Sequence, residues 1–158
     1  MTPGAVSSTL VAHSPADPET AGRRLGEVAE PGDILLLDGP LGAGKTVLVR
    51  GISSGLGWSG EVGSPTFVLV RQYPGRLELV HADLYRLSDR QEIDDLGLLD
   101  LSGNGVLAVE WADRAPWLAI EGSARISLLP GDSEDERVIS MVGGERRLHD
   151  ALSGGKVG

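Results

Sequence analysis

The residues from Gly39 to Thr46 have the types and the spacing that bind a chain of phosphates. They read Gly-Pro-Leu-Gly-Ala-Gly-Lys-Thr and fit the pattern G-x-x-x-x-G-K-[ST]. Glycines let the backbone turn back on itself and direct successive N–H groups at one anion. The Lys45 ammonium would reach the β- and γ-phosphates of a nucleotide, and the Thr46 hydroxyl would bind Mg²⁺. Only Lys45 and Lys156 are lysines among the 14 Lys and Arg residues, so a compact ammonium stands out at this position.

A strand before this loop and a helix after it would position the phosphate-binding groups. The apolar run 34–37 is typical of a strand that is buried on both faces. Leu48, Ile52 and Leu56 recur at the spacing of one helix face. Gly55 and Gly57 can end that helix. A helix that starts at the loop adds its dipole to the attraction for phosphate. This context favours a phosphate site over an ordinary glycine-rich turn.

Two carboxylates follow apolar runs and could hold Mg²⁺. Glu110 follows the run 106–109, and Asp83 follows the run 77–82. In an open parallel sheet the carboxyl ends of the strands border the ligand-binding crevice. Phosphate loops need a carboxylate near the metal at such a place. We favour Glu110 as the metal ligand because its apolar run is the tighter pattern, and we keep Asp83 as a second candidate.

Three further side chains could take part, and each also has a plainer interpretation. Thr66 could sense the γ-phosphate or the metal, or be an ordinary strand threonine. We interpret His81 as a strand histidine with a satisfied hydrogen bond rather than as a ligand. Trp111 directly follows Glu110 and could report on the site, or pack in the core. The only asparagine is Asn104, so an Asn-Lys-x-Asp guanine element is missing, and ATP is favoured over GTP.

The composition limits the class of protein. The chain has 158 residues, of which 41% are hydrophobic and 23% charged, as in an ordinary globular domain. It has no cysteine, which excludes a disulfide framework and a thiolate metal site. We see neither a secretory leader nor an apolar run of membrane-spanning length, so we expect a cytoplasmic protein without membrane contact. A net charge of −9 argues against a protein that binds nucleic acid by itself.

The pattern of the whole chain predicts one α/β domain. We expect a P-loop NTPase-like fold in three layers, with a mixed sheet that includes an antiparallel hairpin. The hairpin is expected at residues 67–70 and 77–82, because a Pro-Gly turn separates two apolar runs. We place the domain at residues 1–142 and interpret the glycine-rich residues 143–158 as a flexible C-terminal tail. The other expected elements are strands at 6–12, 126–129 and 137–142 and helices that begin within 14–18 and 88–92.

Four short motifs follow one another along the chain. They are Leu-Gly-Ala-Gly-Lys-Thr at 41–46, Ser-Pro-Thr-Phe at 64–67, His-Ala-Asp-Leu-Tyr-Arg at 81–86 and Glu-Trp at 110–111. In order and spacing these motifs resemble the bacterial TsaE family, also called YjeE, over about residues 17–114. The resemblance implies a small ATPase of the pathway that adds a threonylcarbamoyl group to the adenosine beside the anticodon of tRNA. It also implies ATP and Mg²⁺ as cofactors and the proteins TsaD and TsaB as partners, with tRNA reached only through them.

The resemblance also implies roles for single residues. It assigns Thr46 and Glu110 to the metal, and Lys45, Asp83 and Thr66 to catalysis. The residues implied to bind the nucleotide are Thr20, near the base, and the loop residues Leu41, Gly42, Ala43, Gly44, Lys45 and Thr46. Pro40 departs from the family, which usually has a polar or acidic residue there, and proline removes an N–H from the mouth of the loop.

Two other classes of protein remain open. A small-molecule kinase would share the phosphate loop and the metal carboxylate. It would also need an acceptor pocket and an arginine-rich lid, for which residues 86–90 are thin. A nucleotide-gated adaptor would bind ATP without turning it over. A screen for phosphoryl transfer to metabolites would identify the kinase, and ATP turnover in the presence of partners would separate an ATPase from an adaptor.

Overall fold

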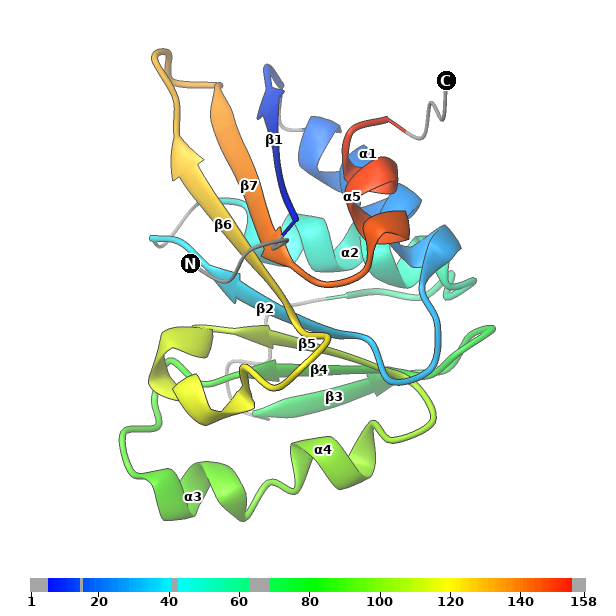
Figure 1. Ribbon diagram of the computed structural model, residues 1–158, viewed down its shortest axis with the longest axis vertical. Coiled ribbons are helices and arrows are strands. Elements are labelled where there is room, and N and C mark those ends of the chain that lie inside the picture. Colours follow the sequence, from blue (N-terminus) through cyan, green and yellow to red (C-terminus); the bar gives the residue numbers. More distant parts are fainter. Residues whose placement is uncertain (1–5, 15, 41–42, 63–68, 155–158) are drawn as a thin grey trace.

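The computed structural model describes residues 6–14, 16–40, 43–62 and 69–154 (Figure 1). Within these residues, seven strands form one sheet in the order β1-β7-β6-β2-β5-β4-β3. The central strands β6, β2, β5 and β4 are parallel to one another, and β1, β7 and β3 add antiparallel pairs at the two ends. The strands are β1 Ser7–Ala12, β2 Ile34–Asp38, β3 Val70–Tyr73, β4 Leu79–Asp83, β5 Val106–Glu110, β6 Ala124–Pro130 and β7 Arg137–Gly143.

Helices cover both faces of this sheet and complete a three-layer fold (Figure 1). One face carries α1 Ala16–Val28, α2 Lys45–Gly55 and α5 Arg146–Leu152. The other carries α3 Arg90–Asp94, α4 Leu98–Leu101, η1 Ala112–Arg114 and η2 Pro116–Leu118. Alternate residues of β2 face opposite ways, so Leu35 and Leu37 join one apolar core whereas Ile34 and Leu36 join the other. The expected α/β fold with a mixed sheet is confirmed.

Glycines bring α1 and α2 into direct backbone contact. Each helix carries a Gly-x-x-x-Gly pair, Gly22 and Gly26 in α1 and Gly51 and Gly55 in α2. A Cβ atom at Gly22 would lie 2.2 Å from the carbonyl oxygen of Leu48 in α2. A Cβ atom at Gly51 would lie 2.0 Å from the carbonyl oxygen of Glu19 in α1. No side chain fits at these positions without moving a helix. The spacing of the glycines therefore fixes α1 against the helix that follows the phosphate loop.

The antiparallel hairpin is present, with strand limits shifted along the chain. It consists of β3 and β4, which pair from Val70 with Ala82 to Tyr73 with Leu79. Residues 67–68 of the expected first strand lie outside the described residues. The helix expected from residue 88 is divided into α3 and α4, because Gly97 adopts a positive φ of 62° between them.

The end of the chain differs from the flexible tail that the sequence predicts from residue 143. Helix α5 occupies part of it and buries Leu148 and Leu152 in the core beneath α1. Arg147 binds the carboxylate of Asp33 through two hydrogen bonds of 2.6 and 2.7 Å, and this contact raises the pKa of the guanidinium. The Arg24 side chain donates to backbone carbonyls at the end of α5, the shorter bond being 2.7 Å. Long-range ion pairing thus holds a helix of only two turns in place.

Candidate functional site

The phosphate loop joins the end of β2 to the start of α2. Gly44 caps the helix with φ 102°, and Gly39 has φ 150°. A Cβ atom at Gly39 would lie 2.5 Å from the Leu128 carbonyl oxygen, so this position also needs glycine. The Ala43 N–H donates to the Pro40 carbonyl at 3.1 Å, so Pro40 serves as an acceptor in the turn. Leu41 and Gly42 lie outside the described residues.

The Lys45 side chain is folded back into this loop. It is 5% exposed, and its ammonium donates to the Gly39 carbonyl. The same Nζ lies 3.9 Å from the centre of the Trp111 ring. Burial lowers the pKa of the Lys45 ammonium, against the opposing effect of nearby carboxylates, of which Glu110 and Asp83 act most strongly. The cation is therefore held, partly desolvated, at the point where the sequence places the phosphates.

Thr46 and Glu110 bring two oxygen donors together beside Lys45. Glu110 ends β5 and is 3% exposed. The Thr46 hydroxyl donates to both carboxylate oxygens of Glu110, at 3.3 Å to Oε1 and 3.2 Å to Oε2. A hydroxyl and a carboxylate are ligands that suit Mg²⁺, which usually takes few protein ligands and completes its shell with water and phosphate. No cluster of three or more His, Cys, Asp or Glu side chains suited to a metal occurs in the described part of the chain.

Asp83 lies at the same edge of the sheet as Glu110. The two residues are directly opposite each other in the β4–β5 register, and Leu37 of β2 pairs with Glu110 on its other side. The Asp83 carboxylate accepts the Tyr85 N–H at 2.9 Å and so shapes the turn that leaves β4. The structure therefore brings both candidate carboxylates to the phosphate loop.

Thr20 is not among the described contacts of Thr46 and Glu110, the two proposed metal ligands. Thr20 lies on the exposed side of α1, where its hydroxyl donates to the Ala16 carbonyl at 3.1 Å. Thr66 lies outside the described residues. A cavity of about 140 Å³ beside the phosphate loop is lined by Pro18, Ala43, Gly44 and Val47 and by Glu134, Asp135 and Arg137 of the β6–β7 turn. Thr20 is not among the residues that line this cavity, so its role near the nucleotide stays a prediction.

Some contacts of the site are not evident from the sequence. The ring of Tyr85 packs on Trp111 with 4.8 Å between ring centres, and Trp111 adopts a left-handed φ of 59°. His81 is fully buried, and its Nε2 lies 2.5 Å from Glu110 Oε2. The sequence predicts a hydrogen bond for His81 but not its partner. The available signal is the alternation along β4, which puts His81 and Asp83 on one face.

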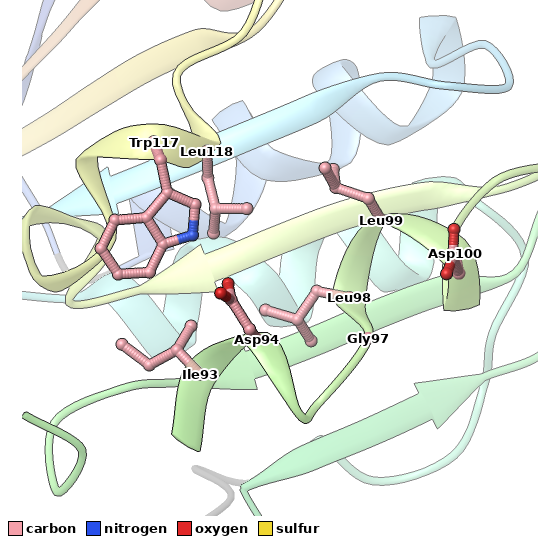
Figure 2. A pocket seen from close by; sticks show the side chains of 8 residues that line it. All are labelled: Ile93, Asp94, Gly97, Leu98, Leu99, Asp100, Trp117 and Leu118. Atoms are coloured by element: carbon pink, nitrogen blue, oxygen red, sulfur yellow. The ribbon is translucent and has the colours of Figure 1, made fainter. Parts of the chain in front are cut away.

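An apolar pocket lies on the other face of the sheet and contains none of the expected site residues. Figure 2 shows the side chains of Ile93, Leu98 and Trp117 around it, with carboxylates at its edge. Its volume is about 270 Å³, and it is bounded by α3, α4 and η2. Nearby, the Arg90 guanidinium lies 4.4 Å from the centre of the Trp117 ring.

Strand, glycine-rich loop with Lys-Thr, helix and a carboxylate on the neighbouring strand together define a P-loop fold. A family model described as "Threonylcarbamoyl adenosine biosynthesis protein TsaE" matches residues 12–139. The chain therefore belongs to the TsaE family, and the resemblance found in the sequence motifs is confirmed.

Individual relatives agree with this assignment. The tRNA threonylcarbamoyladenosine biosynthesis protein TsaE of Treponema pallidum is 40% identical over 119 residues, which cover 75% of this chain and 88% of that protein. The protein of the same name from Bacillus subtilis is 38% identical over 150 residues, or 89% and 94% of the two chains. The crystal structure of YdiB from Bacillus subtilis matches with a TM-score of 0.77 at 29% identity and covers 96% of this chain and 97% of its own.

Within the part of the chain that the structure describes, no helix has both the length and the apolar character needed to cross a bilayer.

Proposed function

We propose that this protein is a Mg²⁺-dependent ATPase that serves threonylcarbamoyl modification of the adenosine beside the anticodon in tRNA. The observation that carries the proposal is the contact between Thr46 and Glu110 next to the buried Lys45. Together these three side chains supply a phosphate-binding cation and two metal ligands at one end of a phosphate loop. The names of the relatives supply the pathway.

Each residue of the site has a defined task in this proposal. Lys45 exchanges the Gly39 carbonyl for phosphate oxygens when a nucleotide enters the loop. Thr46 and Glu110 hold Mg²⁺, which would neutralise charge on the β- and γ-phosphates. Asp83 stands beside Glu110 and is suited to orient the water that attacks the terminal phosphate. Gly44 and the N-terminus of α2 bind the phosphates through backbone N–H groups.

The remaining assignments extend from the resemblance. Thr20 borders the base, Leu41, Gly42 and Ala43 complete the loop, and Thr66 joins the catalytic groups. TsaD and TsaB are the proposed partners, and we expect turnover to be slow until they bind. A net charge of −9 opposes direct binding of a polyanion such as tRNA, so tRNA is reached through those partners. A small-molecule kinase is not favoured, because the matched family and relatives are named for tRNA modification.

Replacement of Glu110 tests the metal part of the proposal. Glu110→Gln keeps the shape of the side chain and removes the charge that holds the metal. We expect nucleotide affinity without metal to change little and Mg²⁺-dependent hydrolysis to fall about 100-fold or more, since a metal contributes several kcal/mol to stabilising the transition state. Glu121→Gln, at an exposed carboxylate outside the phosphate loop, is the matched control. Hydrolysis at the wild-type rate in Glu110→Gln under saturating Mg²⁺ would contradict the assignment.

Addition of partners tests the biological part. The rate of ATP hydrolysis is measured against the concentration of purified TsaD–TsaB, and tRNA binding is measured by gel shift without them. We expect the rate to rise with partner concentration and the gel shift to be weak at physiological salt. A rate that does not respond to the partners, or tight binding of free tRNA, would make this part wrong.

A further inference from the structure

We propose that His81 is a positioning residue that holds the Glu110 carboxylate in the orientation required for the metal, and that Tyr73 holds His81 in turn. The inference rests on the proposed function. Its basis is the 2.5 Å contact between His81 Nε2 and Glu110 Oε2, the shortest of the contacts described for that carboxylate. The side chains of His81 and Glu110 are 0% and 4% exposed, so water does not compete for this bond.

The direction of the hydrogen bond follows from its partners. An ionised carboxylate only accepts hydrogen bonds, so Nε2 of His81 carries a hydrogen and donates it to Glu110. The Tyr73 hydroxyl lies 3.5 Å from Nδ1 of His81 and can donate to it. Tyr73, His81 and Glu110 thus form a row in which each side chain orients the next, and Thr46 also donates to Glu110.

The backbone makes this row rigid. Its three members lie on the adjacent strands β3, β4 and β5, and each of them belongs to a ladder pair. Tyr73 is 5% exposed, and its ring packs against Trp58 with 5.7 Å between ring centres. A side chain held at both ends by packed neighbours has few alternative rotamers. The orientation of His81 is therefore set by the sheet and not by the nucleotide.

Only one oxygen of the Glu110 carboxylate receives the short bond from His81. That oxygen is Oε2, and the Thr46 hydroxyl lies 3.2 Å from Oε2 and 3.3 Å from Oε1. His81 therefore fixes Oε2 and leaves Oε1 with the Thr46 contact alone among the contacts described for it. Outer partners of this kind typically change metal affinity by about 10- to 100-fold.

Two other roles for His81 agree less well with the contacts. As a metal ligand it would need a free ring nitrogen, but Nε2 is engaged with Glu110, and Mg²⁺ prefers oxygen ligands. As a general base it would need access to water, but the side chain is fully buried. The contacts point to orientation of the carboxylate.

The test separates metal binding from nucleotide binding in the full chain. Mn²⁺ affinity is measured by electron paramagnetic resonance in the presence of saturating ADP, and ADP affinity without metal is measured by calorimetry in EDTA. We expect His81→Leu to weaken Mn²⁺ binding about 10- to 100-fold and to leave metal-free ADP affinity within about twofold of wild type, because Lys45 and the loop are intact. His81→Gln, whose amide nitrogen can replace Nε2–H, should recover most of the lost affinity.

A second buried histidine supplies the control. His149 also has two hydrogen-bonding neighbours, Ser8 Oγ and the Gly143 carbonyl, each at 2.7 Å, but it lies in α5. We expect His149→Leu to leave Mn²⁺ affinity unchanged, even if the melting temperature falls. If His81→Leu does not fold, Tyr73→Phe tests the same row, and a drop of about threefold in Mn²⁺ affinity is expected because only the outer bond is lost.

The outcomes distinguish this inference from the proposed function. If wild type binds ADP but no Mn²⁺ with it, the proposed metal-dependent function fails. If wild type binds both, and folded His81→Leu or Tyr73→Phe binds Mn²⁺ as tightly as wild type, the positioning role is overturned. It is also overturned if His81→Leu loses metal-free ADP affinity and Mn²⁺ affinity by the same factor, because His81 would then support the whole site structurally.

Discussion

Helices α1 and α2 cover one face of the sheet, whereas α3 and α4 cover the other (Figure 1). The first two helices are in close backbone contact with each other, whereas α3 and α4 bury a few apolar side chains against the sheet. On the first face, α1 and α2 have 13 and 11 residues, and their glycines leave no space between them. On the second face, α3 and α4 have five and four residues, and an apolar pocket remains beside them. Helices of that length have little stability of their own, so they depend on the side chains that they bury.

The two faces contribute different parts of the site. Lys45 and Thr46 begin α2 on the closely packed face. Asp83 and Glu110 end the strands from which the chain continues into α3 and η1 on the other face. The Thr46–Glu110 contact therefore joins the start of α2 to the end of a fully buried central strand. The closely packed face thus supplies the groups that bind phosphate, and the strands that lead into the other face supply the carboxylates.

The largest expected difference between the two faces is in the stability lost when one leucine on each face is truncated to alanine. Leu48 of α2 is 0% exposed and Leu98 of α4 is 4% exposed, so their fractional burial is nearly equal. We expect Leu48→Ala to lower the free energy of unfolding by about 4 kcal/mol, and Leu98→Ala by about 2 kcal/mol, because Leu98 already borders a pocket. Urea denaturation of both variants gives the two values. Equal losses would show that the second face is packed as tightly as the first.

Disruption of the glycine contacts between α1 and α2 is expected to cause a somewhat smaller loss of unfolding free energy. Gly51→Ala would bring a methyl group to 2.0 Å from the Glu19 carbonyl oxygen. We expect a loss of about 3 kcal/mol in unfolding free energy, although alanine is the better helix former. Gly103→Ala is the matched control on the other face, since its nearest atom outside the neighbouring residues is 3.5 Å away.

The control should change stability by no more than about 0.5 kcal/mol. If Gly51→Ala is as stable as wild type, α1 can move away from α2, and the close contact does not fix the helix beside the phosphate loop. Both variants are followed by the same thermal and urea unfolding curves.

The phosphate loop and the strand and helix on either side of it could be predicted from the sequence because their signals are local. The apolar run 34–37, the glycines, Lys45 and the leucine spacing of α2 occur within about twenty residues. The position of Glu110 at a strand end also followed from one short run. These parts need no information about distant segments.

The parts that could not be predicted depend on long-range pairing. The His81–Glu110 contact follows from the register between β4 and β5, which places Asp83 opposite Glu110 and is set by two whole strands. Helix α5 is too short to be identified by periodicity, and it is held by Arg147 and Asp33, which are far apart in the sequence. Thr66 remains a prediction. Tertiary contacts decided each feature that the local pattern did not indicate.

The smallest expected effect concerns the charge that the closely packed face keeps out of water. Burial lowers the pKa of Lys45 from its ordinary value of 10.5, so the folded protein binds this proton more weakly than the unfolded chain does. Below the lowered pKa the charged side chain therefore destabilises the fold. This penalty disappears as the pH rises through the lowered pKa towards the ordinary value. Wild type should thus gain stability relative to Lys45→Met as the pH rises.

Urea denaturation of both proteins without nucleotide, at about pH 7 and about pH 10, measures this change. Groups that titrate alike in the two proteins cancel in the difference between them. If α2 holds its first residue rigidly, the ammonium stays between the Gly39 carbonyl and the Trp111 ring and cannot reach water. In that case wild type gains unfolding free energy relative to Lys45→Met between the two pH values. A difference that does not change with pH would mean that Lys45 reaches solvent before a nucleotide binds, and the loop would then be mobile on the face that the glycines otherwise hold fixed.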